Sequence, residues 1–192
     1  MTSKLNCNLI QNKQLLNNNI PSSLKNLTYG IYPDSISYND NRFIYNKLFN
    51  YFPLAMYYPR NYKDISYLIK EFVKNNSEFA IRCGGHSNEP TSLSNGFIID
   101  VKNINEIKIN KTNKTAKIGS GTRLGPFSEA LKKYKLMTSV GDSSCVGMSG
   151  LSLSGGKGYL SRLHGMICDN IISLQVINYE GELININENN YP

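Results

Sequence analysis

The six residues Arg-Cys-Gly-Gly-His-Ser at positions 82–87 constrain this chain more than any other stretch of its sequence. The apolar run Phe79-Ala80-Ile81 comes directly before them and is typical of a buried strand. Two successive glycines form a turn whose backbone amides can approach an anion closely, and the turn fixes His86 at its edge. Strand, glycine turn and histidine together indicate a site that holds a cofactor by its phosphates beside a reactive side chain.

A β-α-β unit delivers this turn. Residues 54–58 predict a strand that Pro59 ends. Asn61 is placed to cap the following helix, and Asn75-Asn76 to end it. The strand 79–83 closes the unit, so the glycine turn lies at the carboxyl end of a strand, where open α/β sheets bind ligands. The apolar side chains of the helix follow the i, i+3, i+4, i+7, i+8 spacing of a face buried on one side: Ile65, Leu68, Ile69, Phe72 and Val73.

The other predicted elements are shorter. Residues up to about Leu27 are polar and rich in asparagine, which predicts an irregular surface leader. Tyr134 is expected on the inner face of a helix. The pattern predicts a short helix over 42–49, a strand over 97–101, a hairpin over 107–118, a helix over 124–134 and a final hairpin over 171–186.

The segment Gly141–Gly158 is rich in glycine and serine. A flexible linker would have this composition, but apolar residues are interleaved with the small ones. We therefore expect a buried loop that approaches a ligand closely. The interleaved apolar residues are Val146, Met148, Leu151 and Leu153.

Bulk properties exclude several classes of protein. No apolar run in the 192 residues is long enough to span a membrane, and residues 1–8 lack the apolar segment of a signal peptide, so we expect a cytoplasmic or otherwise intracellular protein. The net charge of +7 comes from scattered lysines, which favours small anionic ligands over nucleic acid. The four cysteines form no C-x-x-C pair, so no metal site is expected.

Together these motifs resemble the flavin-binding domain of the vanillyl-alcohol-oxidase superfamily, and within it the berberine-bridge-enzyme-like oxidases and bacterial sugar oxidases. The resemblance runs from about Tyr57 to Pro192. Its motifs are R-x-G-G-H-S, G-F-I-I-D, G-x-G-T, V-G-x-x-G-L-S-L-S-G-G-K-G and S-R-x-H-G-M-x-C-D-N. It implies an α+β fold with an FAD-binding PCMH-type domain of two α/β subdomains over 51–192, preceded by an irregular leader with a short helix over 1–50. It also implies FAD as the cofactor.

The resemblance assigns roles to individual residues. His86 would be bonded covalently to the 8α-methyl group of the flavin, which raises the flavin's redox potential and prevents its loss. Residues of the same turn would donate backbone amides to the pyrophosphate: Cys83, Gly84, Gly85 and Ser87. A second loop would run along the other side of the cofactor: Ser143, Val146, Gly147, Met148, Gly150 and Ser152. Gly156 and Gly158 would keep a turn free of side chains near the phosphates or the adenine, and Ile177 would lie beside the adenine.

The second loop departs from the family pattern at one position. Relatives with two covalent bonds carry G-x-C-P-x-V-G, and that cysteine is bonded to C6 of the flavin. Alignment on Val146-Gly147 places Ser143 at the cysteine position, and Cys145 falls two positions later. We therefore expect a single covalent link, through His86, with a link through Cys145 as the alternative.

The implied activity is oxidation of an alcohol, sugar or similar small molecule, with molecular oxygen as the acceptor. Family members are more than twice as long, and their substrate-covering part carries the group that removes the substrate's proton. The flavin domain is therefore expected to be incomplete here, with no catalytic base among these residues. The alternatives are a catalytically incomplete flavin-binding remnant and a dehydrogenase of the same superfamily. A nicotinamide-binding protein is disfavoured because Gly119-Ser120-Gly121 is not completed by a glycine at Leu124.

Three residues near the motifs have simpler interpretations. Arg82 could pair with a phosphate or equally with a structural carboxylate. Cys83 is expected to pack behind the turn as a small side chain. His164 lies where a short helix would end, and a positive side chain suits that end, so we expect a structural role.

Overall fold

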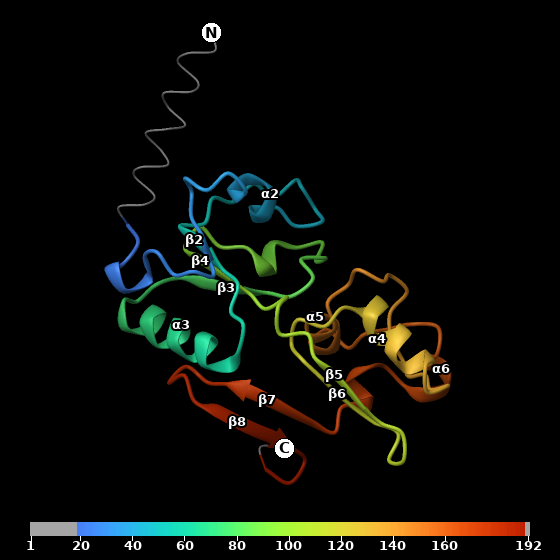
Figure 1. The fold of residues 1–192 in the computed structure, drawn as a ribbon. Helices are drawn as coiled ribbons and strands as arrows, with labels where there is room; N and C mark the ends of the chain where they lie inside the picture. The colour runs from blue at the N-terminus through green and yellow to red at the C-terminus, as the bar shows by residue number, and fades with distance from the viewer. Residues whose placement is uncertain (1–18, 191–192) are drawn as a thin grey trace.

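The fold was analysed in a computed structural model that describes residues 19–190 (Figure 1). Two single-turn 3-10 segments flank the sheet at Ser22–Leu24 and Pro90–Ser92, and a third lies at Cys168–Asn170. The helices and strands are β1 Gly30–Ile31, α2 Tyr38–Arg42, β2 Ala55–Tyr57, α3 Tyr62–Lys74, β3 Phe79–Arg82, β4 Phe97–Asp100, β5 Ile107–Asn110, β6 Thr115–Ile118, α4 Leu124–Lys132, α5 Met148–Leu153, α6 Ser161–His164, β7 Ser173–Ile177 and β8 Leu183–Asn187.

The main sheet has the strand order β1-β2-β4-β3. Strands β2 and β3 both run parallel to β4, which lies between them, and β1 is antiparallel to β2. The predicted β-α-β unit is therefore confirmed, with a third strand inserted between its two strands. Because β3 and β4 are parallel and Arg82 is paired with Asp100, the glycine turn leaves the sheet at the carboxyl edge shared by both strands.

Helix α3 forms as its sequence predicts. The side chain of Asn61 caps it by accepting a hydrogen bond from the Asp64 amide at 3.0 Å, and Asn75 is its C-cap. The helix covers one face of the sheet, and its buried side chains are Ile65, Leu68, Ile69 and Phe72. Val73, which the spacing placed on the same face, is half exposed. Phe72 stacks on Phe97 of β4 with ring centroids 4.8 Å apart, which joins the helix to the centre of the sheet.

Three apolar cores follow from this arrangement. The face of the sheet under α3 carries Tyr57 and Ile99, and the opposite face carries Met56 and Ile98, as the alternation of a strand requires. The third core lies apart from the sheet, among α4, α5 and the β5–β6 hairpin. In Figure 1, the main sheet with α3 lies beside the group formed by α4, α5 and the β5–β6 hairpin, and the β7–β8 hairpin lies next to α3. The fold is α+β, as expected.

The helix expected over 42–49 is wrong. Helix α2 ends at Arg42, Phe43 after it has an extended backbone, and the following residues form a bend and a turn that bond to the glycine turn and the loop after it. The amide of Tyr45 donates to the carbonyl of Gly85 at 2.8 Å, and the side-chain amide of Asn46 donates to the carbonyl of Asn88 at 3.0 Å. These bonds to a distant loop replace the i to i−4 bonds that a helix would need.

The described part of the expected leader, residues 19–27, consists of turns and one 3-10 segment and is mostly exposed, but Ile20 and Leu24 in it are buried. Leu24 is fully buried in the core under α3, and its carbonyl accepts hydrogen bonds from the hydroxyls of Tyr32 and Tyr57. Strand β1 then extends the main sheet. Two apolar residues in an asparagine-rich stretch give little periodicity, and tertiary packing overrides that weak signal. The rest of the leader lies outside the described residues.

Two further expectations need correction. Helix α4 ends at Lys132, and Tyr134 is exposed instead of facing inward. The segment 141–158 is not a continuous buried loop, because residues 148–153 form α5 and Leu153 points to solvent. Small residues do not prevent a helix where one apolar side chain, here Met148, anchors it in a core.

Within residues 19–190, no helix has the length and apolar character needed to cross a membrane. In the same residues, no three histidine, cysteine or carboxylate side chains gather in a way that could bind a metal ion.

A buried ion pair fixes the base of the glycine turn. The Nε of Arg82 lies 2.7 Å from a carboxylate oxygen of Asp100, and both side chains are less than one-tenth exposed. The guanidinium also donates to the hydroxyl of Tyr58 at 3.2 Å. Burial raises the pKa of Tyr58 to about 12, so this hydroxyl stays protonated near neutral pH. Arg82 therefore has a structural partner, which decides between the two interpretations that the sequence left open.

We expect Asp100→Ala to destabilise the chain by about 3–5 kcal/mol, because it leaves the Arg82 charge buried without its partner. Glu106→Ala is the matched control. It removes an ion pair with Lys108 of similar length, 2.9 Å, whose side chains are both largely exposed, and should cost less than about 1 kcal/mol. Urea unfolding followed by circular dichroism measures both. Equal losses in the two variants would contradict the role of the buried pair.

Candidate functional site

Two loops that are distant in the sequence meet at Gly84 and Gly147, which are 63 positions apart. A Cβ atom on Gly84 would collide with the backbone nitrogen of Gly147, and one on Gly147 would lie 2.5 Å from the nitrogen of Gly84. Only glycine at both positions permits this approach. The turn after β3 and the loop before α5 therefore form one continuous surface at the carboxyl edge of the sheet.

The first loop presents free backbone donors. Within residues 19–190, the amides of Gly84, Gly85, His86 and Ser87 donate no hydrogen bond to the protein. Gly85 has a φ of +60°, which turns the chain so that successive amides can face one side. All four residues are only partly buried. Such a run of unpaired amides in partly exposed residues is a donor set that suits a pyrophosphate.

His86 lies at the end of this run with its ring held in place. The ring of Tyr45 stacks on it, with centroids 4.3 Å apart and an angle of 13° between the planes. Its Nε2 lies 3.3 Å from the sulfur of Cys145 in the second loop. Among the described residues, Nδ1 has no hydrogen-bond partner. The imidazole is therefore oriented, partly accessible and free at one nitrogen.

The second loop is fixed from below by the segment that precedes α4. The Val146 carbonyl accepts from the Leu124 amide at 3.0 Å, and the Met148 amide donates to the Thr122 carbonyl at 2.9 Å. The hydroxyl of Ser149 donates to the carbonyl of Ser120 at 2.8 Å. The Gly119–Thr122 motif thus positions the loop, a role that its sequence did not reveal.

The other residues predicted for the site differ in their surroundings. Gly150 has open space where a side chain would be, so a ligand can approach its backbone. Met148 is almost fully buried in the third core, and the hydroxyl of Ser152 donates to the Met148 carbonyl at 2.7 Å. Ser143 places its hydroxyl 3.3 Å from the sulfur of Cys145.

Packing inside the protein explains the residues predicted to lie near the phosphates or the adenine, which are Gly156, Gly158 and Ile177. A Cβ on Gly158 would collide with the carbonyl of Val140, and one on Gly156 with the side chain of Ile167. Ile177 lies in β7 and packs on the core under α3. Packing alone thus accounts for the residue type at all three positions. Contacts of these residues with a phosphate or an adenine stay predictions.

Cys83 and Cys145 are in different environments. The sulfur of Cys83 lies behind the turn, 3.8 Å from the carbonyl of Thr122 and against Gly147. Burial raises the pKa of the Cys83 thiol, which keeps it protonated and unreactive near neutral pH. Cys145, by contrast, is exposed.

Sequence reasoning missed two features of the site. Tyr45 belongs to the segment 42–49, for which the sequence predicts a short helix, and nothing in its spacing connects it to His86. Cys145 was considered only as a second bond to the flavin, and its contact with the imidazole had no signal in the sequence. The periodicity of apolar residues reports only local structure, so it cannot predict which residues of two distant loops come into contact.

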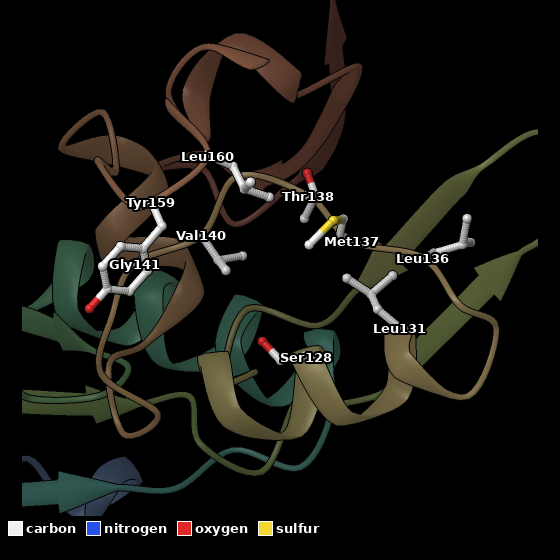
Figure 2. Close-up of a pocket in the computed structure, with 9 residues that line it drawn as sticks. All are labelled: Ser128, Leu131, Leu136, Met137, Thr138, Val140, Gly141, Tyr159 and Leu160. Atoms are coloured by element: carbon white, nitrogen blue, oxygen red, sulfur yellow. The ribbon is translucent and has the colours of Figure 1, made fainter. Parts of the chain in front are cut away.

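A cavity of about 300 Å³ lies between α4 and the chain around residue 160 (Figure 2). Its walls contain no carboxylate, amine, imidazole or thiol, so it lacks the groups that acid–base or nucleophilic chemistry needs. In Figure 2, Ser128 and Leu131 extend from α4 on one side, and Val140 and Leu160 lie across from them. The lining residues are Ser128, Leu131, Leu136, Met137, Thr138, Val140, Gly141, Tyr159 and Leu160.

Comparison with known proteins identifies the family. A sequence model of the FAD binding domain matches residues 53–187, most of the chain. The chain belongs to this FAD binding domain family. FAD is accordingly its cofactor, and the free amides of the first loop fit the pyrophosphate of FAD. The family's members include FAD-linked oxidoreductases, so the chain belongs to an oxidoreductase family.

Three relatives show the extent of the likeness. The FAD-linked oxidoreductase YgaK of Bacillus subtilis is 34% identical over 164 residues, which are 83% of this chain and 36% of YgaK. The 6-hydroxy-D-nicotine oxidase of Arthrobacter nicotinovorans superposes with a TM-score of 0.82 at 26% identity, over 85% of this chain and 36% of that enzyme. The berberine-bridge-enzyme-like protein 1 of Physcomitrella patens gives 0.79 at 30% identity, over 82% and 35%. The chain therefore spans about a third of the length of these relatives.

We expect Gly147→Ala to destabilise the chain by about 1–3 kcal/mol, because its methyl group forces Cys83 and Gly84 away from the second loop. Gly150→Ala makes the same chemical change three residues later, where nothing lies within 4 Å of the added carbon. It should leave stability unchanged or raise it by up to about 1 kcal/mol, since alanine favours a helix more than glycine does. Thermal unfolding of the two variants and the parent measures the difference. Equal stability of Gly147→Ala and the parent would show that the loops can separate without cost.

Proposed function

We propose that this chain binds FAD across the joined loops, with the pyrophosphate on the amides of residues 84–87 and the flavin ring near His86. The unpaired amides and the accessible imidazole at their end support this placement. Gly84 and Gly147 are in direct contact, so no ligand fits between the loops at that point. The cofactor therefore lies along the surface that the two loops form together.

The second loop completes this surface. Ser143 and Val146 lie on the loop that meets the glycine turn, and Gly150, with open space at its backbone, lies in the helix α5 that follows this loop. Met148 and Ser152 contribute by holding the loop and α5 in place, because their side-chain contacts are internal to the protein. Some of the predicted residues thus face the cofactor, and the others hold the cofactor-facing residues in place.

We assign the covalent attachment to His86 alone. Nδ1 of its imidazole is free, while Tyr45 and Cys145 restrain the ring. Ser143 cannot form the thioether of relatives with two covalent bonds, because it has a hydroxyl in place of a thiol. A covalent bond would keep the flavin in an open site, which suits a surface whose donors are all partly accessible.

The reaction proposed for the whole protein is oxidation of a small molecule such as an alcohol or a sugar, with molecular oxygen as the acceptor. When bound, FAD supplies the two-electron redox chemistry. The residues described here bind and orient it. The 6-hydroxy-D-nicotine oxidase among the relatives is an oxidase by name, which favours oxygen over another electron carrier. Release of hydrogen peroxide during turnover would distinguish the oxidase from a dehydrogenase.

The covalent link is tested by His86→Ala. The parent chain, produced with ample FAD and denatured in acid, should carry the mass of one flavin, and the variant should carry none. His164→Ala is the matched control, because His164 is the other histidine of the chain and lies at the end of α6. It should keep the full flavin mass in intact-protein mass spectrometry. A parent chain without added mass, or a flavin that persists in His86→Ala, would contradict the link.

A further inference from the structure

The contact between Cys145 and His86 has a consequence for how the flavin is attached. The sulfur lies 3.3 Å from Nε2 of the imidazole and 3.3 Å from the hydroxyl of Ser143. Cys145 is exposed and belongs to none of the three apolar cores. Its side chain therefore contributes little to packing, and its polar neighbours are the imidazole and one hydroxyl.

This contact makes the two nitrogens of His86 different. A hydrogen between Nε2 and the sulfur can belong to either atom, and each choice fixes the tautomer of the ring. If Nε2 carries the hydrogen and donates it to the sulfur, Nδ1 keeps its lone pair. Nδ1 is also the nitrogen without a partner among residues 19–190. The ring of Tyr45 stacks on one face of the imidazole, and a half-turn of the imidazole that exchanged the two nitrogens would have to break this stacking on the way.

Attachment requires that this same hydrogen leave. When Nδ1 bonds to carbon, the imidazole becomes neutral only after Nε2 has lost its hydrogen. Cys145 is the group that faces Nε2 at that moment. As a thiolate it can accept the proton, and because it is exposed it can pass the proton on to water.

We propose that Cys145 accepts the proton that leaves Nε2 of His86 when the flavin is attached at Nδ1. This inference rests on the proposed covalent link at His86. It gives Cys145 a part in making the bond, whereas the alternative stated from the sequence made Cys145 itself a point of attachment.

The reaction balances with dioxygen as the oxidant. The bond that forms joins Nδ1 to the 8α carbon, and the bonds that break are one C–H of the methyl group and the Nε2–H of the imidazole. The two hydrogens and two electrons released reduce the flavin, and dioxygen then takes them up as hydrogen peroxide. Cys145 ends as it began, since it only relays a proton.

The test measures the rate at which the flavin-free chain becomes covalently modified after FAD is added in air. Cys145→Ala should slow attachment by about 100-fold, the lower range for loss of a positioned base, since water reaches this exposed site. Cys145→Asp restores a proton acceptor at the same position and should recover much of the rate. Cys168→Ala is the control, because its sulfur contacts Asp169, far along the chain from His86, and it should attach flavin at the parent rate.

Three further measurements separate the outcomes. Non-covalent FAD affinity and thermal unfolding should match the parent in Cys145→Ala, which excludes a loss of fold or of binding. Nuclear magnetic resonance of the histidyl-flavin released by proteolysis should show substitution at Nδ1.

Attachment at the parent rate in Cys145→Ala, or substitution at Nε2 in the parent, would overturn the inference and leave the covalent link at His86 intact. A flavin found on Cys145 in His86→Ala would also overturn it, because the thiol would then be a point of attachment. Absence of covalent flavin from the parent would overturn the proposed link, and this inference with it.

Discussion

The backbones of Gly84 and Gly147 meet with no side chain between them, and the geometry of the site depends on that contact. Each loop alone is a short connection with several unpaired amides, which is costly to order. Together they brace one another and bring the sulfur of Cys145 within hydrogen-bonding distance of His86. A methyl group at either glycine would separate the two loops, which the proposed function requires to bind one ligand together.

Support for the contact comes from both sides. Under the first loop, the Arg82–Asp100 pair ties the carboxyl ends of β3 and β4 together inside the sheet. Under the second loop, backbone bonds to Thr122 and Leu124 hold residues 146–148. A rigid base on each side allows the loops themselves to remain partly exposed and to keep their donors free, which is the arrangement that a bound anion needs.

The sequence predicted the parts of the fold that depend on local periodicity. The apolar spacing and the Asn61 cap located α3, and the apolar runs located β2, β3 and β4 but not β1, because burial is visible in the order of residues only where the apolar run is long enough. Such spacing carries no information about contacts between distant segments. The residues around Tyr45 were therefore expected to form a helix, although their amides bond to the glycine turn. The glycine turn and His86 were identified from the motif, but the ring's two neighbours came from the structure.

The chemistry of the two cysteines near the turn follows from burial more than from sequence position. Cys83 is adjacent to the glycines, yet its sulfur packs behind them, and its raised pKa makes it a small apolar side chain. Cys145 is 59 residues from His86 in sequence, yet its exposed sulfur meets the imidazole. The family motif has its cysteine two positions earlier, at the position of Ser143, and therefore assigns no role to Cys145. In the proposed attachment, its position opposite Nε2 connects it to the ring hydrogen that leaves when Nδ1 forms a bond.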